Sequence, residues 1–123
     1  MEKIKISNLS KVWLIDLDGT VVKHNGYLNG KEEFLPGAKE FLTSISTSDT
    51  IIFLTSRKEK FKEDTIKFLK DNGIKFDFII FNLPEGERIL INDIKPGGLK
   101  TAICVNVVRD SIWNLQFEID EKL

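Results

Sequence analysis

The sequence predicts an α/β fold in which a parallel sheet is covered by helices on both faces. Two observations carry this prediction. Short apolar runs without polar alternation recur along the chain, as is typical of strands buried on both sides. Between the first of these runs lie segments with apolar residues at helical spacing. Because crossovers between parallel strands are right-handed, the carboxyl ends of the strands should share one edge, where such folds bind ligands.

The length of 123 residues predicts a single domain, 1–123, with one core. A content of 41% hydrophobic and 30% charged residues is typical of a soluble globular protein, and the net charge of -1 gives no overall field that would recruit nucleic acid or an anionic membrane. No apolar run has the length of a membrane span, so we expect a cytoplasmic protein with no membrane partner. Cys104, in an apolar run, is expected to be buried and structural.

The first third of the chain contains an expected strand, a flap and a helix. Residues 4–6, where isoleucines alternate with a lysine, fit a short edge strand, and 12–16 fit the first buried strand. The polar stretch 20–34 carries two Asn-Gly turn signals and is expected to form a hairpin flap over the end of that strand. A helix should open near Pro36. Its buried stripe is expected to contain Ala38, Phe41, Leu42 and Ile45.

The rest of the chain continues the alternation. Residues 50–54 are rich in β-branched and aromatic side chains and fit a second buried strand. The segment 58–72 is expected to be the second helix, ending at Gly73. The last fifteen residues fit either a strand or a short closing helix. Three further apolar runs are expected to be strands: 76–81, 88–92 and 101–108.

Polar side chains follow several of these expected strands. Asp16 and Asp18 end the first, residues 55–57 follow the second, and residues 92–93 follow a later one. The two carboxylates share a pocket if the chain stays extended, and they diverge if it turns after Leu17. A carboxylate at the mouth of a buried strand is unfavourable unless a cation, donors or water satisfy it. The choice is therefore between a solvated Asp-Gly turn and a metal or catalytic site.

Three segments resemble motifs of the haloacid dehalogenase superfamily of phosphohydrolases. DLDGT (16–20) matches the first motif, LTSR (54–57) the second, and ILINDIKP (89–96) the fourth. The resemblance covers most of the chain, about 12–108. It implies a three-layer, Rossmann-like fold and a phosphatase that uses Mg²⁺. Members of this superfamily choose substrates largely through inserted cap domains, and segment 21–34 and the short loop after Phe81 leave no room for one of usual size.

The same resemblance implies roles for individual residues. Asp16 would be the nucleophile that forms an aspartyl-phosphate, and Asp18 the general acid and base. Mg²⁺ would be held by the Asp16 carboxylate, the Asp18 backbone carbonyl and Asp93. Thr55 would donate its hydroxyl to a phosphoryl oxygen. For the basic residue of the third motif we rank Arg88 first.

Other side chains are weaker candidates. Lys95 and Lys58 are the alternatives to Arg88, and Ser56 lies beside Thr55. Arg57 fits a structural ion pair as well as it fits a substrate contact. His24, in the flap, is either solvated or in contact with substrate. The substrate-binding residues expected from the sequence are Ser56, Arg57, His24 and Lys95.

The resemblance leaves the substrate open. Segments 24–30 and 91–110 are similar to small bacterial members of surface-polysaccharide and sugar-phosphate metabolism, which favours a sugar phosphate or related metabolite. Without a cap, the site suits a large substrate, a lid supplied by a partner, or a homo-oligomer whose neighbour covers it. A nucleic-acid end phosphatase and a non-catalytic binding domain are the alternatives; no basic stripe supports the first, and retention of Asp16 and Asp18 argues against the second. We expect Asp16, Thr55 and Asp93 to converge.

Overall fold

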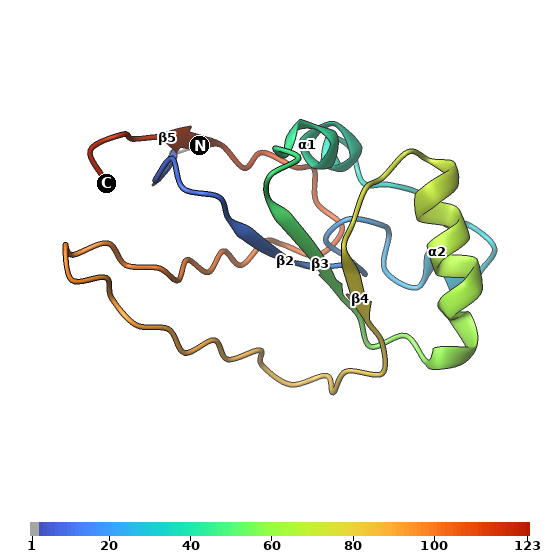
Figure 1. Ribbon diagram of the computed structural model, residues 1–123. Helices are drawn as coiled ribbons and strands as arrows, with labels where there is room; N and C mark the ends of the chain where they lie inside the picture. Colours follow the sequence, from blue (N-terminus) through green and yellow to red (C-terminus); the bar gives the residue numbers. More distant parts are fainter. Residues whose placement is uncertain (1–2) are drawn as a thin grey trace.

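The computed structural model describes residues 3–123, which form an α/β fold with parallel sheets (Figure 1). Within this range no helix is long and apolar enough to cross a membrane. Short 3-10 turns lie at Gly26–Leu28 and Glu59–Phe61. The elements are, in chain order, β1 (Ile4–Ile6), β2 (Val12–Asp16), α1 (Ala38–Ser44), β3 (Thr50–Leu54), α2 (Lys62–Asp71), β4 (Phe78–Ile80) and β5 (Phe117–Ile119).

The central sheet has the strand order β2-β3-β4, and all three strands are parallel. Ile15 lies opposite Phe53, and Phe53 opposite Ile79. β1 and β5 pair in parallel as a separate two-stranded sheet. The predicted strands at 4–6, 12–16 and 50–54 are confirmed, the run at 76–81 contains a shorter strand, and the ambiguous C-terminal segment contains a strand.

Both helices pack on the same face of the central sheet. Leu42 of α1 and Leu69 of α2 belong to one buried cluster with Ile15 and Phe53 of the strands. Phe53 and Leu69 have no exposed surface. Two right-handed crossovers that advance in the same direction across a sheet leave their helices on one side of it, which accounts for this arrangement.

The opposite face of the sheet differs from the prediction of helices on both faces. Here β2 presents Val12 and Leu14, and β4 presents Phe78 and Ile80, all exposed. Val12 is 62% and Phe78 60% exposed, and no helix within residues 3–123 packs over them. An unbroken apolar run indicates a buried strand, but it does not say which element buries each face.

The predicted strands at 88–92 and 101–108 are absent from the described chain. Residues 84–108 instead form an extended segment, which follows β4 and runs away from the central sheet (Figure 1, gold to orange). It contains one antiparallel bridge, between Ile94 and Lys100. Strand propensity is realised only where a neighbouring strand pairs, and these runs have none.

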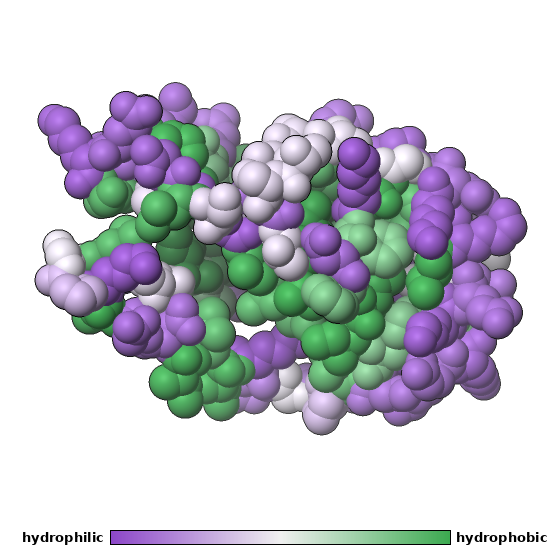
Figure 2. Space-filling view, viewed as in Figure 1, coloured by the Kyte–Doolittle hydropathy of each residue, from purple (hydrophilic) through white to green (hydrophobic). Residues whose placement is uncertain are grey.

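Because the extended segment does not pack, its apolar side chains remain exposed. Ile91 is 89% exposed, and green side chains are visible over this part of the surface in Figure 2. Cys104 is exposed as well, so the prediction of a buried, structural cysteine was wrong. Its apolar neighbours, which suggested burial, are themselves on the surface.

The flap, residues 20–34, is closed at its base. Val22 and Phe34 form an antiparallel bridge, and the backbone N–H of Lys23 donates to the Glu33 carbonyl at 3.0 Å. Val21 and Val22 are almost completely buried in the core. The expected hairpin is thus present only at its base, and a 3-10 turn replaces the strands above it.

Candidate functional site

The site lies where the carboxyl ends of the three central strands meet. The ladder continues past the strands, since the Leu17 N–H donates to the Leu54 carbonyl and the Thr55 N–H to the Ile80 carbonyl, both at 3.0 Å. The residues that follow β2 and β3 are therefore held side by side. The backbone that carries the polar side chains predicted for this edge is therefore fixed by hydrogen bonds.

A tight turn separates the two aspartates. The Leu17 carbonyl accepts the N–H groups of Val21 and Val22, at 2.9 and 3.1 Å, so the chain reverses directly after Leu17. Gly19 has φ +82°, a conformation that glycine adopts without strain. Of the two arrangements left open by the sequence, the structure has the turned one. Asp16 and Asp18 accordingly have separate partners.

Asp16 faces the extended segment. Its Oδ1 accepts a hydrogen bond from Arg88 Nη1 at 2.7 Å, and its Oδ2 accepts one from the Thr20 hydroxyl at 2.8 Å. The side chains of Asp16 and Arg88 are both 36% exposed, so this ion pair remains in contact with water. The structure thereby brings together two residues that the sequence placed 72 positions apart.

Asp18 is more enclosed, with 16% of its side chain exposed. Its Oδ2 accepts the Thr55 hydroxyl at 2.7 Å. Its Oδ1 accepts Arg57 Nε at 3.0 Å and lies 2.9 Å from Arg57 Nη2. The two carboxylates, with one residue between them, thus have different surroundings. Asp16 faces solvent and a half-exposed cation, whereas Asp18 is held by buried donors.

Arg57 is the centre of a buried polar network. Its Nη1 and Nη2 donate to Glu32 of the flap at 2.9 and 2.7 Å, and Nη1 also donates to the Thr65 hydroxyl of α2 at 3.0 Å. The guanidinium lies 3.9 Å from the centre of the Tyr27 ring. Burial lowers the pKa of Arg57, but hydrogen bonds from the guanidinium to Glu32 and Asp18 outweigh it, so the pKa is raised overall.

The donors of Arg57 are directed at protein groups. A guanidinium has five N–H groups; four of those of Arg57 donate to Asp18, Glu32 and Thr65, and Nη2 also lies 2.9 Å from Asp18 Oδ1. The side chain is 1% exposed. Of the two interpretations that the sequence allowed, the geometry fits the structural ion pair and not the substrate contact.

Thr55 is also fully buried. Its hydroxyl donates to Asp18 and accepts the Arg57 backbone N–H at 3.0 Å. A hydroxyl has one proton to donate, so in this arrangement the proton is used on Asp18 and is not offered to a phosphoryl oxygen. Ser56, the next residue, is half-buried.

Asp93 is not brought to the aspartates. It lies on the extended segment with its side chain exposed, and its backbone carbonyl accepts the Thr101 hydroxyl at 2.5 Å. Across residues 3–123 no three His, Cys, Asp or Glu side chains are grouped so that they could hold a metal ion. The expected convergence of Asp16 with Asp93 is therefore absent from this arrangement, because the segment that carries Asp93 does not join the sheet.

Within residues 3–123 the Asp16 side chain bonds to Thr20 and Arg88 and to none of the remaining candidates. Lys95 is exposed in the turn of the extended segment, where its N–H donates to the Leu99 carbonyl at 2.9 Å. Lys58 is exposed before α2. The His24 backbone N–H donates to Asp110 Oδ1 at 2.8 Å, and His24 Nδ1 is buried without a partner in the described part of the chain.

Glu32, Tyr27 and Thr20 were not singled out from the sequence, although each contacts an aspartate or Arg57. Thr20 belongs to DLDGT, so its position in that motif was an available signal. Glu32 is one of two consecutive acids in a polar loop, and nothing in its spacing links it to Arg57. Only the folded path of the flap brings them together.

Comparisons with known proteins give one distant likeness. No family model matches the chain, and no curated protein matches it. A chain in a solved structure described as "Structure of Pnkp1/Rnl/Hen1 complex" superposes with a TM-score of 0.51 at 21% sequence identity. The match covers 68% of this chain and 32% of that one, so the present chain spans about a third of its length. At this identity the likeness supports the α/β fold.

Proposed function

We propose that this protein is a phosphatase that hydrolyses a phosphate monoester through an aspartyl-phosphate on Asp16. The observation that carries the proposal is the unequal environment of two carboxylates at one strand end. Asp16 is accessible to solvent, as an attacking group must be to reach a phosphate. It also lies beside the cation Arg88, which could offset the charge of that phosphate. Asp18 is fixed by Thr55 and Arg57, as a residue that must transfer protons at one defined position would be.

The proposed reaction has two steps. An Asp16 oxygen attacks phosphorus, and the bond to the leaving oxygen breaks. The leaving oxygen takes the proton that the Asp18 carboxyl group carries when it enters this step. Asp18 then takes a proton from water as the water oxygen attacks phosphorus, which releases inorganic phosphate and restores Asp16. The Arg88 guanidinium would offset the charge that the phosphoryl group brings to the Asp16 carboxylate.

The assignment to this chemistry rests on the resemblance of DLDGT and LTSR to the haloacid dehalogenase superfamily, and the substrate class rests on the similarity of segments 24–30 and 91–110 to its small bacterial members. In support, DLDGT and LTSR lie at adjoining strand ends, as that resemblance implies. The flap is too short to act as a domain and is held by the Glu32–Arg57 pair. We propose a sugar phosphate or related small metabolite as the substrate.

Mg²⁺ is proposed on the resemblance alone, because the described side chains do not fit a magnesium site as they stand. Both carboxylate oxygens of Asp16, the first expected ligand, already accept hydrogen bonds from Thr20 and Arg88. Asp93, the third expected ligand, is not grouped with them. Magnesium requires a near-octahedral set of oxygen ligands, which these side chains do not provide in this arrangement.

A phosphate-release assay tests the function. We expect turnover of p-nitrophenyl phosphate and of members of a sugar-phosphate panel with Mg²⁺ present, and loss of turnover after chelation with EDTA. A metal requirement would mean that the segment with Asp93 reaches Asp16 in the active enzyme. Turnover that survives EDTA would remove Mg²⁺ from the proposal. Absence of turnover on every ester, with and without metal, would contradict the phosphatase itself.

Arg88→Met should lower kcat/KM by about 10²-fold, because it removes a cation 2.7 Å from the proposed nucleophile. The free energy of unfolding should change by less than about 1 kcal/mol, since the pair is exposed to water. Steady-state kinetics and urea unfolding measure the two effects separately. Lys95→Met and Lys58→Met test the two alternatives to Arg88, and both should lose less activity than Arg88→Met. A larger loss in either variant would transfer the role of the basic residue to that lysine.

A further inference from the structure

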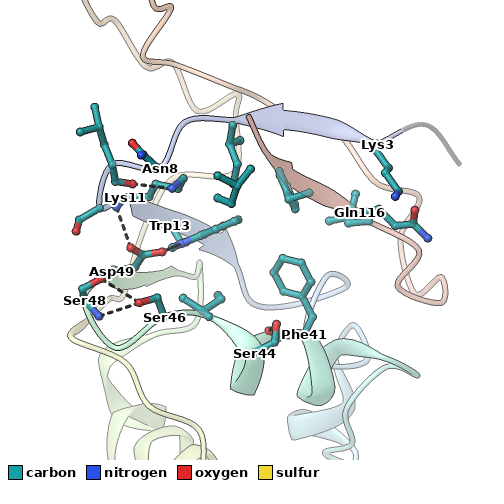
Figure 3. Close-up of a pocket in the computed structure, with 17 residues that line it drawn as sticks. Lys3, Asn8, Lys11, Trp13, Phe41, Ser44, Ser46, Ser48, Asp49 and Gln116 are labelled. Atoms are coloured by element: carbon teal, nitrogen blue, oxygen red, sulfur yellow. Dashed lines mark hydrogen bonds between the residues drawn. The ribbon is translucent and has the colours of Figure 1, made fainter. Parts of the chain in front are cut away.

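A cavity of about 720 Å³ lies at the end of the central sheet opposite to Asp16 and Asp18. Lys11 and Asp49, which precede β2 and β3, are part of its wall (Figure 3). β1 and the segment before β5 form one side, and the end of α1 forms the other. A strand of five residues spans roughly 16 Å, so the cavity is separate from the proposed catalytic site. Its volume is within the range of sites that bind small molecules.

The floor of the cavity is aromatic. The Trp13 ring meets Phe41 and Phe117 edge-on, with ring centres 5.7 and 5.1 Å apart, and Phe41 and Phe117 are themselves 5.8 Å apart. Rings that pack against one another in this way restrict each other's rotation. Figure 3 shows Trp13 in the middle of the cavity with Phe41 beside it. The floor is therefore a preformed apolar surface.

Asp49 fixes the aromatic floor, and both of its carboxylate oxygens accept hydrogen bonds from the protein. Its Oδ2 accepts the Trp13 indole N–H at 2.9 Å, and its Oδ1 accepts the Lys11 backbone N–H at 3.0 Å. With both oxygens occupied by protein donors, the carboxylate offers little to a ligand. Its role is to fix the orientation of the indole.

The rim is cationic. Two lysines, Lys3 and Lys11, line the cavity against the single acid Asp49. The Lys11 ammonium donates to the Leu9 carbonyl at 2.6 Å, a neutral acceptor that leaves its charge uncompensated. An ammonium carries three donors, so others remain for an anion. The rest of the polar rim consists of uncharged hydroxyl and amide side chains, among them Ser46 and Gln116.

We propose that this cavity is a binding site for a small amphiphilic anion. The apolar body would lie on the surface formed by Trp13, Phe41 and Phe117, and a carboxylate or phosphate-type head would bind the Lys11 ammonium. Burial of the body provides affinity, and the charge of the head distinguishes the ligand from neutral apolar molecules. The proposal does not depend on phosphatase activity, because none of these residues takes part in it.

Trp13 is a natural reporter for the test, since the chain has only two tryptophans. In a Trp113→Phe background we would titrate octanoate, octylphosphonate and neutral 1-octanol while following Trp13 fluorescence. We expect saturable binding of at least one anion and about tenfold weaker binding of 1-octanol, the difference that one charge-assisted hydrogen bond supplies. Comparison of octanoate with octylphosphonate identifies the preferred head group. If the variant does not fold, the indole N–H resonance of Trp13 in the wild-type protein gives the same measurement.

Lys11→Met should weaken binding of the anion about tenfold and leave 1-octanol unchanged. Lys23→Met, which changes an exposed lysine of the flap, is the matched control and should have no effect. Three results would each overturn the proposal: no saturable change with either anion, equal affinity for the anions and 1-octanol, or an unchanged affinity in Lys11→Met.

Discussion

Asp16→Asn is expected to lower kcat/KM for phosphate release by on the order of 10³-fold or more, because an amide does not replace a carboxylate as the attacking group. The substitution preserves the size of the side chain and one oxygen that can accept from Thr20 or Arg88. The ion pair it removes is exposed to water, so the free energy of unfolding should change by less than about 1 kcal/mol. Steady-state kinetics and urea unfolding of the same preparation separate the two quantities.

Asp71→Asn is the matched control, since it removes an exposed carboxylate of α2 that pairs with Lys67. It should retain wild-type activity.

A second measurement detects the covalent intermediate directly. Brief incubation with a labelled phosphate ester, followed by an acid quench, should trap phosphoenzyme in the wild type and none in Asp16→Asn. If Asp16→Asn kept more than a tenth of wild-type activity, the aspartyl-phosphate would have to be abandoned.

The central strands that were predicted correctly are those that pair with a neighbouring strand. VWLID at 12–16 and TIIFL at 50–54 are unbroken apolar runs that end in polar residues, and each has a strand neighbour in the sheet. RILIN at 88–92 also contains an unbroken apolar run followed by a polar residue, but it forms no strand in the structure. The difference is not in the run itself, because pairing depends on a partner strand far away in the sequence. The same missing contact accounts for the exposure of Cys104.

In the candidate site, too, some contacts could be predicted from the sequence and others could not. Asp16, Asp18 and Thr55 lie directly after adjacent strands, so their proximity could be predicted from sequence, and Thr55 Oγ1 lies 2.7 Å from Asp18. The partners of Arg57 could not be predicted from the sequence. Its Nη groups reach Glu32, 25 residues earlier, and Thr65, 8 residues later, and neither spacing has a recognisable pattern. Its burial depends on how the flap folds over α2.

Arg57→Met is expected to lower the free energy of unfolding by about 3 kcal/mol, because it leaves Glu32 and Asp18 partly buried beside each other without their shared cation. Urea unfolding monitored by fluorescence measures the change. Because the pKa of Arg57 is raised, its contribution to stability is present below the ordinary pKa of arginine and is lost only as pH rises above it. The difference in the free energy of unfolding between Arg57→Met and the wild type should thus stay constant from pH 6 to pH 9.

Two further variants separate charge from geometry. Arg57→Lys keeps a cation but has no planar fork, so it should recover only part of the lost stability. Glu32→Gln keeps a side chain of the same size and should be less harmful than Arg57→Met, because Asp18 remains paired with Arg57. If Arg57→Met unfolded at the same urea concentration as the wild type, the flap would not depend on this network. The fixed position of Asp18, on which its proposed role in proton transfer rests, would then need another origin.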